Sequence, residues 1–81
     1  MGIYRTFVEL PYNEQQEFQD CCERQRFNRK EFKVISNEAN DRYRTVTVTH
    51  QGRERHYMAC EDKNWLADFD NDLASGYFHV P

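Results

Sequence analysis

The sequence predicts an α+β fold in which an antiparallel sheet of three to four strands carries two helices on one face. Two neighbouring segments alternate their residues as the strands of a hairpin do, and two others repeat apolar residues at helical spacing. The 81 residues allow one hydrophobic core, so we expect a single domain over residues 1–81. The expected order is β-α-β-β-β-α, with Tyr77–Val80 as a short final strand or a docked terminus.

The clearest structural signal is a β-hairpin over Tyr43–Cys60. From Thr45 to Thr49 the residues alternate Thr and Val, which is typical of a half-buried strand. Residues 53–60 alternate again, and Gly52 between the two runs suits a turn that needs a positive φ angle. We therefore expect the hairpin to form the centre of the sheet.

Loop length decides which side chains share a face of this hairpin. A two-residue loop would pair Val46 with Tyr57 and would mix apolar with charged side chains on one face. A three-residue loop with Gly52 in a bulge pairs Val46 with His56. The sequence favours the three-residue loop, because one face is then mostly apolar. The expected inner residues are Val46, Val48, His56 and Met58, and the expected outer residues are Thr45, Thr47, Thr49, Arg53, Arg55 and Tyr57.

The sequence of the N-terminal third predicts a strand followed by a helix. Ile3–Leu10 is rich in β-branched and aromatic residues and stops at Pro11. Asn13 with Gln16 three residues later forms a capping-box pattern, so we expect the helix to begin there. The apolar stripe of this helix is thin and comprises Phe18, Cys21 and Cys22, with Gln25 and Phe27 at its end.

The other expected elements are a short strand over Phe32–Ser36 and a C-terminal helix. Asp62 or Asn64 is the expected cap of that helix, and Gly76 suits a left-handed residue at its end. Its apolar stripe is the stronger of the two and comprises Trp65, Leu66, Phe69 and Leu73.

Two other element orders stay open. If Phe32–Ser36 is a loop, the order becomes that of a split βαβ fold. If Ile3–Leu10 is peripheral, the remaining α-β-β-β-α order resembles that of double-stranded-RNA-binding domains. The resemblance is confined to element order, because Glu61, Asp62 and Lys63 stand where such domains carry a basic helix N-terminus.

Charge is segregated along the chain, although the net charge is only −3. Residues 1–23 and 56–81 each carry a net charge of −4, whereas residues 24–55 carry +5. No apolar run approaches the roughly 18 residues of a membrane span. The three cysteines are odd in number and two are adjacent, so we expect a reducing, cytoplasmic location without membrane association.

We expect no metal, cofactor or catalytic site. Cys21 and Cys22 are adjacent and would point about 100° apart on a helix, while His50 and His56 lack the spacing of zinc ligands. A calcium loop beginning at Asp68 would need Gly at its sixth position and Glu at its twelfth, and the chain has neither there. No Gly-rich phosphate loop occurs, and no nucleophile and base are placed together, so an enzyme is not expected.

By elimination, the sequence predicts a small non-catalytic protein-binding or inhibitor module that acts through charged surfaces. The alternative is single-stranded RNA binding through the basic and aromatic outer face of the hairpin. A pI near 5.5 disfavours that alternative, because nucleic-acid-binding domains commonly exceed about 9. Homodimerisation is a third alternative. The candidate binding residues are Asp68, Asp70, Asp72, Tyr43, Arg44, Arg53, Arg55 and Tyr57.

Overall fold

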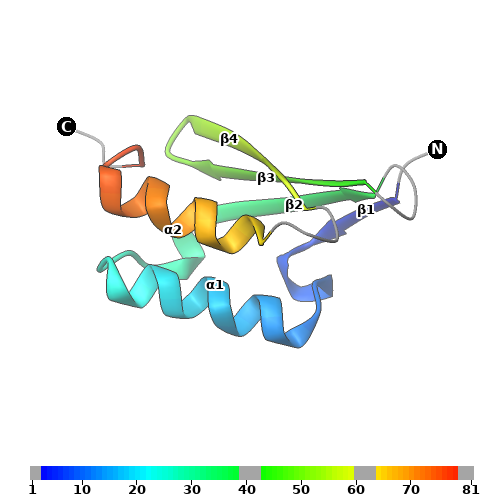
Figure 1. Ribbon diagram of the computed structural model, residues 1–81, viewed down its shortest axis with the longest axis horizontal. Coiled ribbons are helices and arrows are strands. Elements are labelled where there is room, and N and C mark those ends of the chain that lie inside the picture. Colours follow the sequence, from blue (N-terminus) through cyan, green and yellow to red (C-terminus); the bar gives the residue numbers. More distant parts are fainter. Residues whose placement is uncertain (1–2, 39–42, 60–63, 79–81) are drawn as a thin grey trace.

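The computed structural model describes residues 3–38, 43–59 and 64–78 and shows four strands and two α-helices within them (Figure 1). Two short 3-10 helices, η1 and η2, connect these elements. In chain order the elements are β1 (Ile3–Thr6), η1 (Phe7–Glu9), α1 (Tyr12–Arg24), η2 (Arg29–Glu31), β2 (Phe32–Glu38), β3 (Arg44–His50), β4 (Arg53–Met58) and α2 (Trp65–Ser75).

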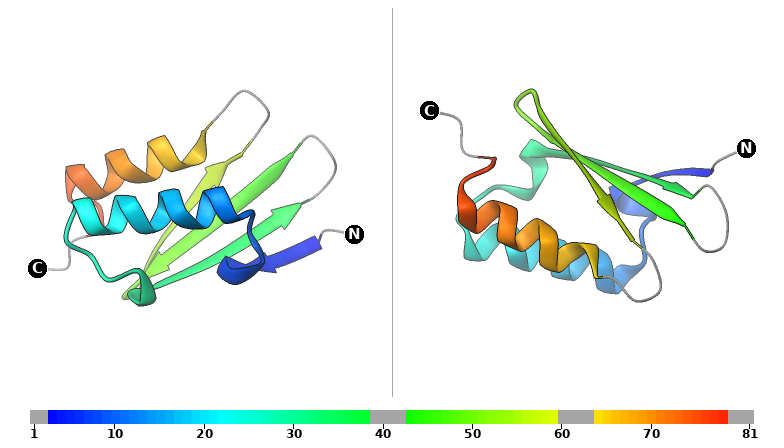
Figure 2. Two further views of the ribbon diagram at one scale, coloured as in Figure 1. Left: turned by 90° about the horizontal axis from the view of Figure 1, so that it is seen from below. Right: turned by 45° about the horizontal axis from the view of Figure 1, so that its top comes forward.

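The predicted α+β architecture is confirmed. All strand pairs are antiparallel, and the strands follow one another across the sheet as β1-β2-β3-β4. Both helices lie side by side on one face of the sheet (Figures 1 and 2). Strands β1 and β4 are therefore the two edges, and α2 lies beside the β4 edge.

The N-terminal prediction was wrong in two details. The strand expected over Ile3–Leu10 ends at Thr6, because Glu9 accepts hydrogen bonds from the Thr6 backbone N–H and hydroxyl and closes a capping box. Helix α1 then begins at Tyr12 with Pro11 at its N-cap, so Asn13 does not cap it. The turn at η1 brings Leu10 into the core.

The later elements agree better with the sequence. The strand expected over Phe32–Ser36 exists and extends to Glu38. Asn64 caps α2 by accepting a hydrogen bond from the Leu66 N–H, and Gly76 adopts φ 87° at its C-terminal end. Tyr77 and Phe78 form no strand; Phe78 docks in the core, while Val80 lies outside the described residues.

The register predicted for the hairpin was wrong. The structure has the two-residue loop Gln51-Gly52, with φ angles of 48° and 84°, so the central residues are both left-handed as in a type I′ turn. Val46 therefore lies opposite Tyr57, and Val48 lies opposite Arg55. Apolar and charged side chains can share this face because β4 is an edge strand. Arg55 points toward the helices but reaches Asp72 of α2 at the edge of the sheet.

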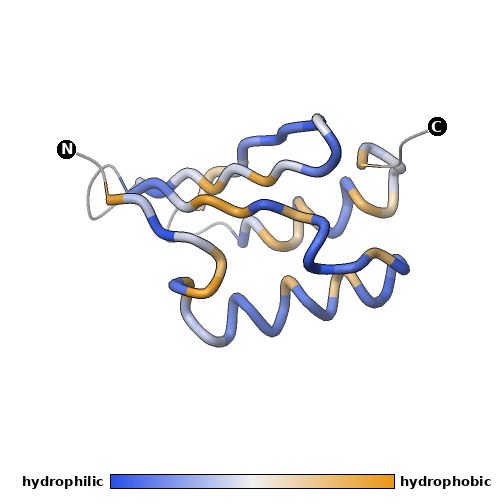
Figure 3. Tube along the Cα trace, turned by 180° about the vertical axis from the view of Figure 1, so that it is seen from behind, coloured by the Kyte–Doolittle hydropathy of each residue, from blue (hydrophilic) through white to orange (hydrophobic). Residues whose placement is uncertain are grey.

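One aromatic core lies between the sheet and the helices. Phe18 of α1 stacks on Phe69 of α2 with ring centroids 4.4 Å apart, and both rings are fully buried. In Figure 3 the hydrophobic positions of α1 recur turn by turn among hydrophilic ones, which reflects its thin stripe. The buried apolar residues are Leu10, Phe18, Cys21, Cys22, Phe32, Val34, Val46, Val48, Tyr57, Trp65, Leu66, Phe69, Leu73 and Phe78.

Candidate binding groove between α2 and β4

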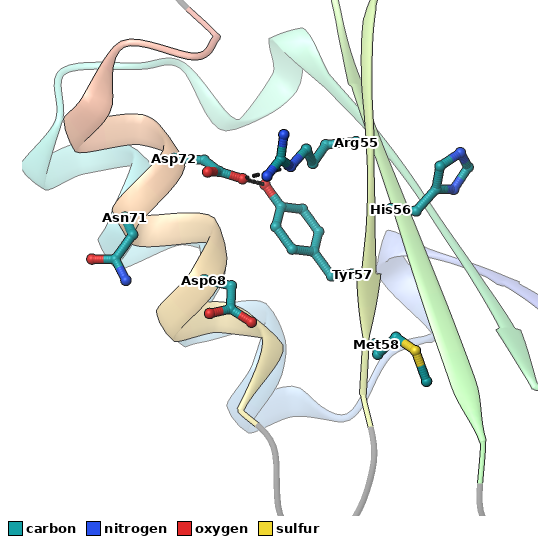
Figure 4. Close-up of a pocket in the computed structure, with 7 residues that line it drawn as sticks. All are labelled: Arg55, His56, Tyr57, Met58, Asp68, Asn71 and Asp72. Atoms are coloured by element: carbon teal, nitrogen blue, oxygen red, sulfur yellow. Dashed lines mark hydrogen bonds and ion pairs between the residues drawn. The ribbon is translucent and has the colours of Figure 1, made fainter.

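A groove of about 290 Å³ lies between α2 and the edge strand β4 (Figure 4). Strand β4 forms one wall and the flank of α2 that faces it forms the other. The lining residues are Arg55, His56, Tyr57, Met58, Asp68, Asn71 and Asp72. Four of the sequence-predicted binding residues thus line one groove, namely Arg55 and Tyr57 of β4 and Asp68 and Asp72 of α2.

The floor of the groove is fixed by Asp72. Its Oδ2 accepts a hydrogen bond of 2.6 Å from the Tyr57 hydroxyl and lies 3.2 Å from Nε of Arg55 (Figure 4). The Arg55 guanidinium also lies over the Tyr77 ring, 4.7 Å from its centroid. One carboxylate therefore joins α2 to two residues of β4.

Burial and this hydrogen bond together raise the pKa of the Tyr57 phenol well above its usual value. Burial is the larger cause, because only 4% of Tyr57 is exposed. The Asp72 carboxylate raises this pKa further, because it accepts a hydrogen bond from the phenolic O–H and thereby stabilises the protonated phenol. Tyr57 is thus a neutral hydrogen-bond donor near neutral pH, and it holds the groove in shape.

The three candidate acids of α2 have different surroundings. Asp68 and Asp72 lie one turn apart and both line the groove, whereas Asp70 lies on the α1 side, 3.5 Å from a guanidinium nitrogen of Arg24. Asp72 is engaged by Tyr57 and Arg55. No described residue forms a hydrogen bond or ion pair with the exposed Asp68. Of these three acids, Asp68 is therefore the one that has no partner among the described residues, and it lies at the rim of the groove.

The predicted basic outer face of the hairpin does not exist. Arg53, Arg55 and Tyr57 lie on the helix side of the sheet, because the two-residue loop reverses the expected parity of β4. Tyr43 precedes β3 and is 54% exposed. Arg53 is exposed at the loop, and no described residue forms an ion pair with it.

Arg44, also a predicted binding residue, is used within the fold. It forms an ion pair with Glu14 of α1, and both side chains are more than four-fifths buried. The same Glu14 oxygen accepts a hydrogen bond of 3.0 Å from the Trp65 indole N–H. No periodic pattern in the sequence marks Glu14 as the residue that joins α1, β3 and α2.

The outer face of the hairpin carries the expected threonines of β3 together with Glu54, His56 and Met58 of β4. Thr47 lies opposite His56, whose Nδ1 is 2.8 Å from the Thr47 hydroxyl and whose Nε2 is 2.9 Å from Glu54. Met58 is 48% exposed. His56 and Met58 were predicted to point inward, and that prediction was wrong for the same reason of parity.

The two described thiols are part of the core. Cys21 and Cys22 are free and buried, and burial raises the pKa of Cys22 to about 12. His50 is the first residue of the three-residue loop His50-Gln51-Gly52 that the sequence favoured, but in the structure it ends β3, with its ring buried against Phe32 and with Nε2 3.1 Å from Glu31. The described residues contain no cluster of three or more side chains that could hold a metal ion.

None of the helices in the described part of the chain is long and apolar enough to cross a membrane. Comparison of the chain with protein-family models, curated proteins and solved structures gave no match.

Proposed function

We propose that this protein is a small non-catalytic module that binds another protein through the groove between α2 and β4, either as an adaptor or as an inhibitor. The observation that carries the proposal is Asp68, an exposed carboxylate that has no partner among the described residues and lies at the rim of a groove beside an edge strand. Exposed acids are ordinary on helices. An acid beside a preformed groove offers a partner both a cation site and a surface to fill.

The polar groups of the groove support binding better than catalysis. The Tyr57 phenol is held neutral, and the Asp72 carboxylate is already engaged by two donors. A general base needs a free lone pair within reach of a substrate proton, and Asp72 offers a poor one. We place the module in the cytoplasm, which the free thiols of Cys21 and Cys22 support.

Single-stranded nucleic-acid binding is less well supported. That alternative required Arg53, Arg55 and Tyr57 to present cations and an aromatic ring together on the open face of the sheet. Arg55 is instead paired with Asp72, and the Tyr57 ring is buried.

Site-specific photo-crosslinking in an extract of the source organism tests the proposal. A photoreactive residue at Asn71, which is exposed and lines the groove, should give a discrete cross-linked protein. The matched control is the same residue at Gln19, which is exposed on α1. Equal cross-linking patterns from both positions, or none from Asn71, would contradict binding at this groove.

A further inference from the structure

We infer that β4 receives an extended segment of the partner as an additional strand, with a Lys or Arg of that segment directed at Asp68. The inference rests on the proposed function and names the kind of ligand that the groove fits. Three observations lead to it: the direction of the β4 backbone groups, the point where the open edge stops, and the charge on the facing helix.

The hairpin register determines which backbone groups of β4 are available. In an antiparallel pair joined by a two-residue loop, alternate residues exchange hydrogen bonds with the partner strand. The Ala59 N–H donates to the Arg44 carbonyl at 2.8 Å, so the exchanging residues of β4 are Arg53, Arg55 and Tyr57. The N–H and C=O groups of the residues between them, Glu54, His56 and Met58, therefore point away from β3.

The open edge is closed at one end by the C-terminal segment. The Tyr77 hydroxyl donates a hydrogen bond of 2.9 Å to the Glu54 carbonyl, which confirms that this carbonyl points outward. No described residue bonds the backbone of His56 or Met58. The N–H and C=O groups of His56 and Met58 thus remain available to a ligand. These four groups match an added strand of about four or five residues.

Side-chain alternation then determines the chemistry of the ligand. The ligand residue opposite Tyr57 would direct its side chain to the helix side, because side chains of paired residues share a face. There it meets the groove wall with Asp68, so a Lys or Arg at this position is complementary. Its two neighbours would lie on the outer face beside the half-exposed Met58, which favours apolar or β-branched residues.

Strand addition also explains how a small groove could hold a protein ligand. Main-chain hydrogen bonds supply affinity in this binding mode, and pockets for alternate side chains supply specificity. The β1 edge offers a weaker case, because Ile3–Thr6 is shorter and lies at the opposite edge of the sheet from the groove. We therefore place the added strand at β4.

The test begins with a random heptapeptide library displayed on phage and selected on the whole chain. We expect the selected peptides to share one Lys or Arg flanked by apolar or β-branched residues. A synthetic peptide of that consensus is then N-methylated at one position at a time. Methylation of the residues whose N–H faces β4 should weaken binding roughly tenfold, whereas methylation of the positions between them should not.

Two measurements on the protein complete the test. The His56 and Met58 amide hydrogens should exchange more slowly when the peptide binds. Asp68→Asn should weaken peptide binding on the order of threefold, whereas Asp70→Asn on the α1 side of the same helix should leave it unchanged.

Selection of no cationic consensus, or an N-methyl scan without alternation, would overturn strand addition. A dimer in solution whose His56 and Met58 amides are already protected would assign the edge to a second copy of this chain, and would overturn it too. These failures are distinct from failure of the proposed function. A partner that cross-links at Asn71 but tolerates loss of the strand contacts leaves protein binding intact and removes only this mode.

Discussion

The Tyr57 hydroxyl lies 2.6 Å from Oδ2 of Asp72, and this hydrogen bond joins the edge strand of the sheet to the C-terminal helix. The Tyr57 ring is buried against Trp65 and Phe69, with centroids 6.0 and 6.1 Å away. The tyrosine is thus apolar where it meets the core and polar where it meets the helix. Its two contacts explain why β4 adopts a register that directs Tyr57 inward.

Removal of this hydroxyl should destabilise the protein. Tyr57→Phe keeps the ring but leaves Asp72 with fewer donors, so we expect the free energy of unfolding to fall by about 1 to 2 kcal/mol. Urea denaturation followed by far-UV circular dichroism measures the change. Tyr77→Phe removes an exposed hydroxyl bonded to a carbonyl and should cost less than about 0.5 kcal/mol. Equal effects of the two variants would contradict the role assigned to Tyr57.

The type I′ turn leads to a second prediction, which tests the register of the hairpin. Gln51 occupies φ 48°, which Asn adopts more readily, and Asn-Gly is the preferred pair for this turn. Gln51→Asn should therefore stabilise the protein by roughly 0.5 kcal/mol. Gly52→Ala should destabilise it by about 1 kcal/mol, and through backbone strain alone, because nothing lies within 4 Å of an added Cβ. A three-residue loop would not give this pattern in thermal unfolding, since Gln51 would not need a positive φ.

The Glu14 carboxylate should be essential to the packing of α1. Glu14→Gln leaves the largely buried Arg44 without its anionic partner, so we expect a loss of about 2 to 3 kcal/mol in the free energy of unfolding. The control is Glu17→Gln on the same helix, whose exposed carboxylate accepts a long hydrogen bond of 3.4 Å from Asn64. Equal stabilities of the two variants in urea would contradict the role assigned to Glu14.

The buried Cys22 thiol predicts a loss of stability at alkaline pH. Its pKa in the folded state is about 12, whereas an unfolded thiol titrates near about 8.5. Below about pH 8.5 the thiol is protonated in both the folded and the unfolded protein, so its contribution to the free energy of unfolding is fully present. Above that pH the unfolded state ionises first, and the free energy of unfolding falls by up to about 1.4 kcal/mol per pH unit until the folded thiol titrates.

Comparison with Cys22→Ala isolates this contribution. The variant should be less stable at neutral pH, since a buried side chain is shortened. Its stability should then fall less steeply than that of the unmodified chain between about pH 9 and pH 11. Urea unfolding at several pH values measures both slopes, and equal slopes would show that Cys22 is not held neutral in the fold.

The sequence predicted the elements whose signals are local. Alternation of Thr and Val identified β3, and Asn64 and Gly76 identified the two ends of α2. Side-chain parity misled at β4, because it treats Tyr57 and Arg55 as outward residues. Tertiary contacts with Asp72 satisfy both of them, and no local pattern encodes those contacts.

The groove was predictable only in part, for the same reason. Asp68 and Asp72 stand four residues apart within the predicted C-terminal helix, so a shared helix face could be expected from the sequence, and both line the groove. That this wall faces β4 depends on how the helix packs, and the composition of α2 alone does not show it. The separation of Asp70, which lies beside Arg24 of α1, likewise arises from helix packing.

The most direct test of protein binding at the groove is the affinity of the protein partner identified by cross-linking for two matched variants. We predict that Asp68→Asn lowers the affinity severalfold in isothermal titration calorimetry, whereas Asp70→Asn, with the same charge change on the opposite flank of α2, leaves it unchanged. Equal losses for the two variants would indicate a response to net charge alone. That result, or no loss from Asp68→Asn, would contradict recognition at the groove between α2 and β4.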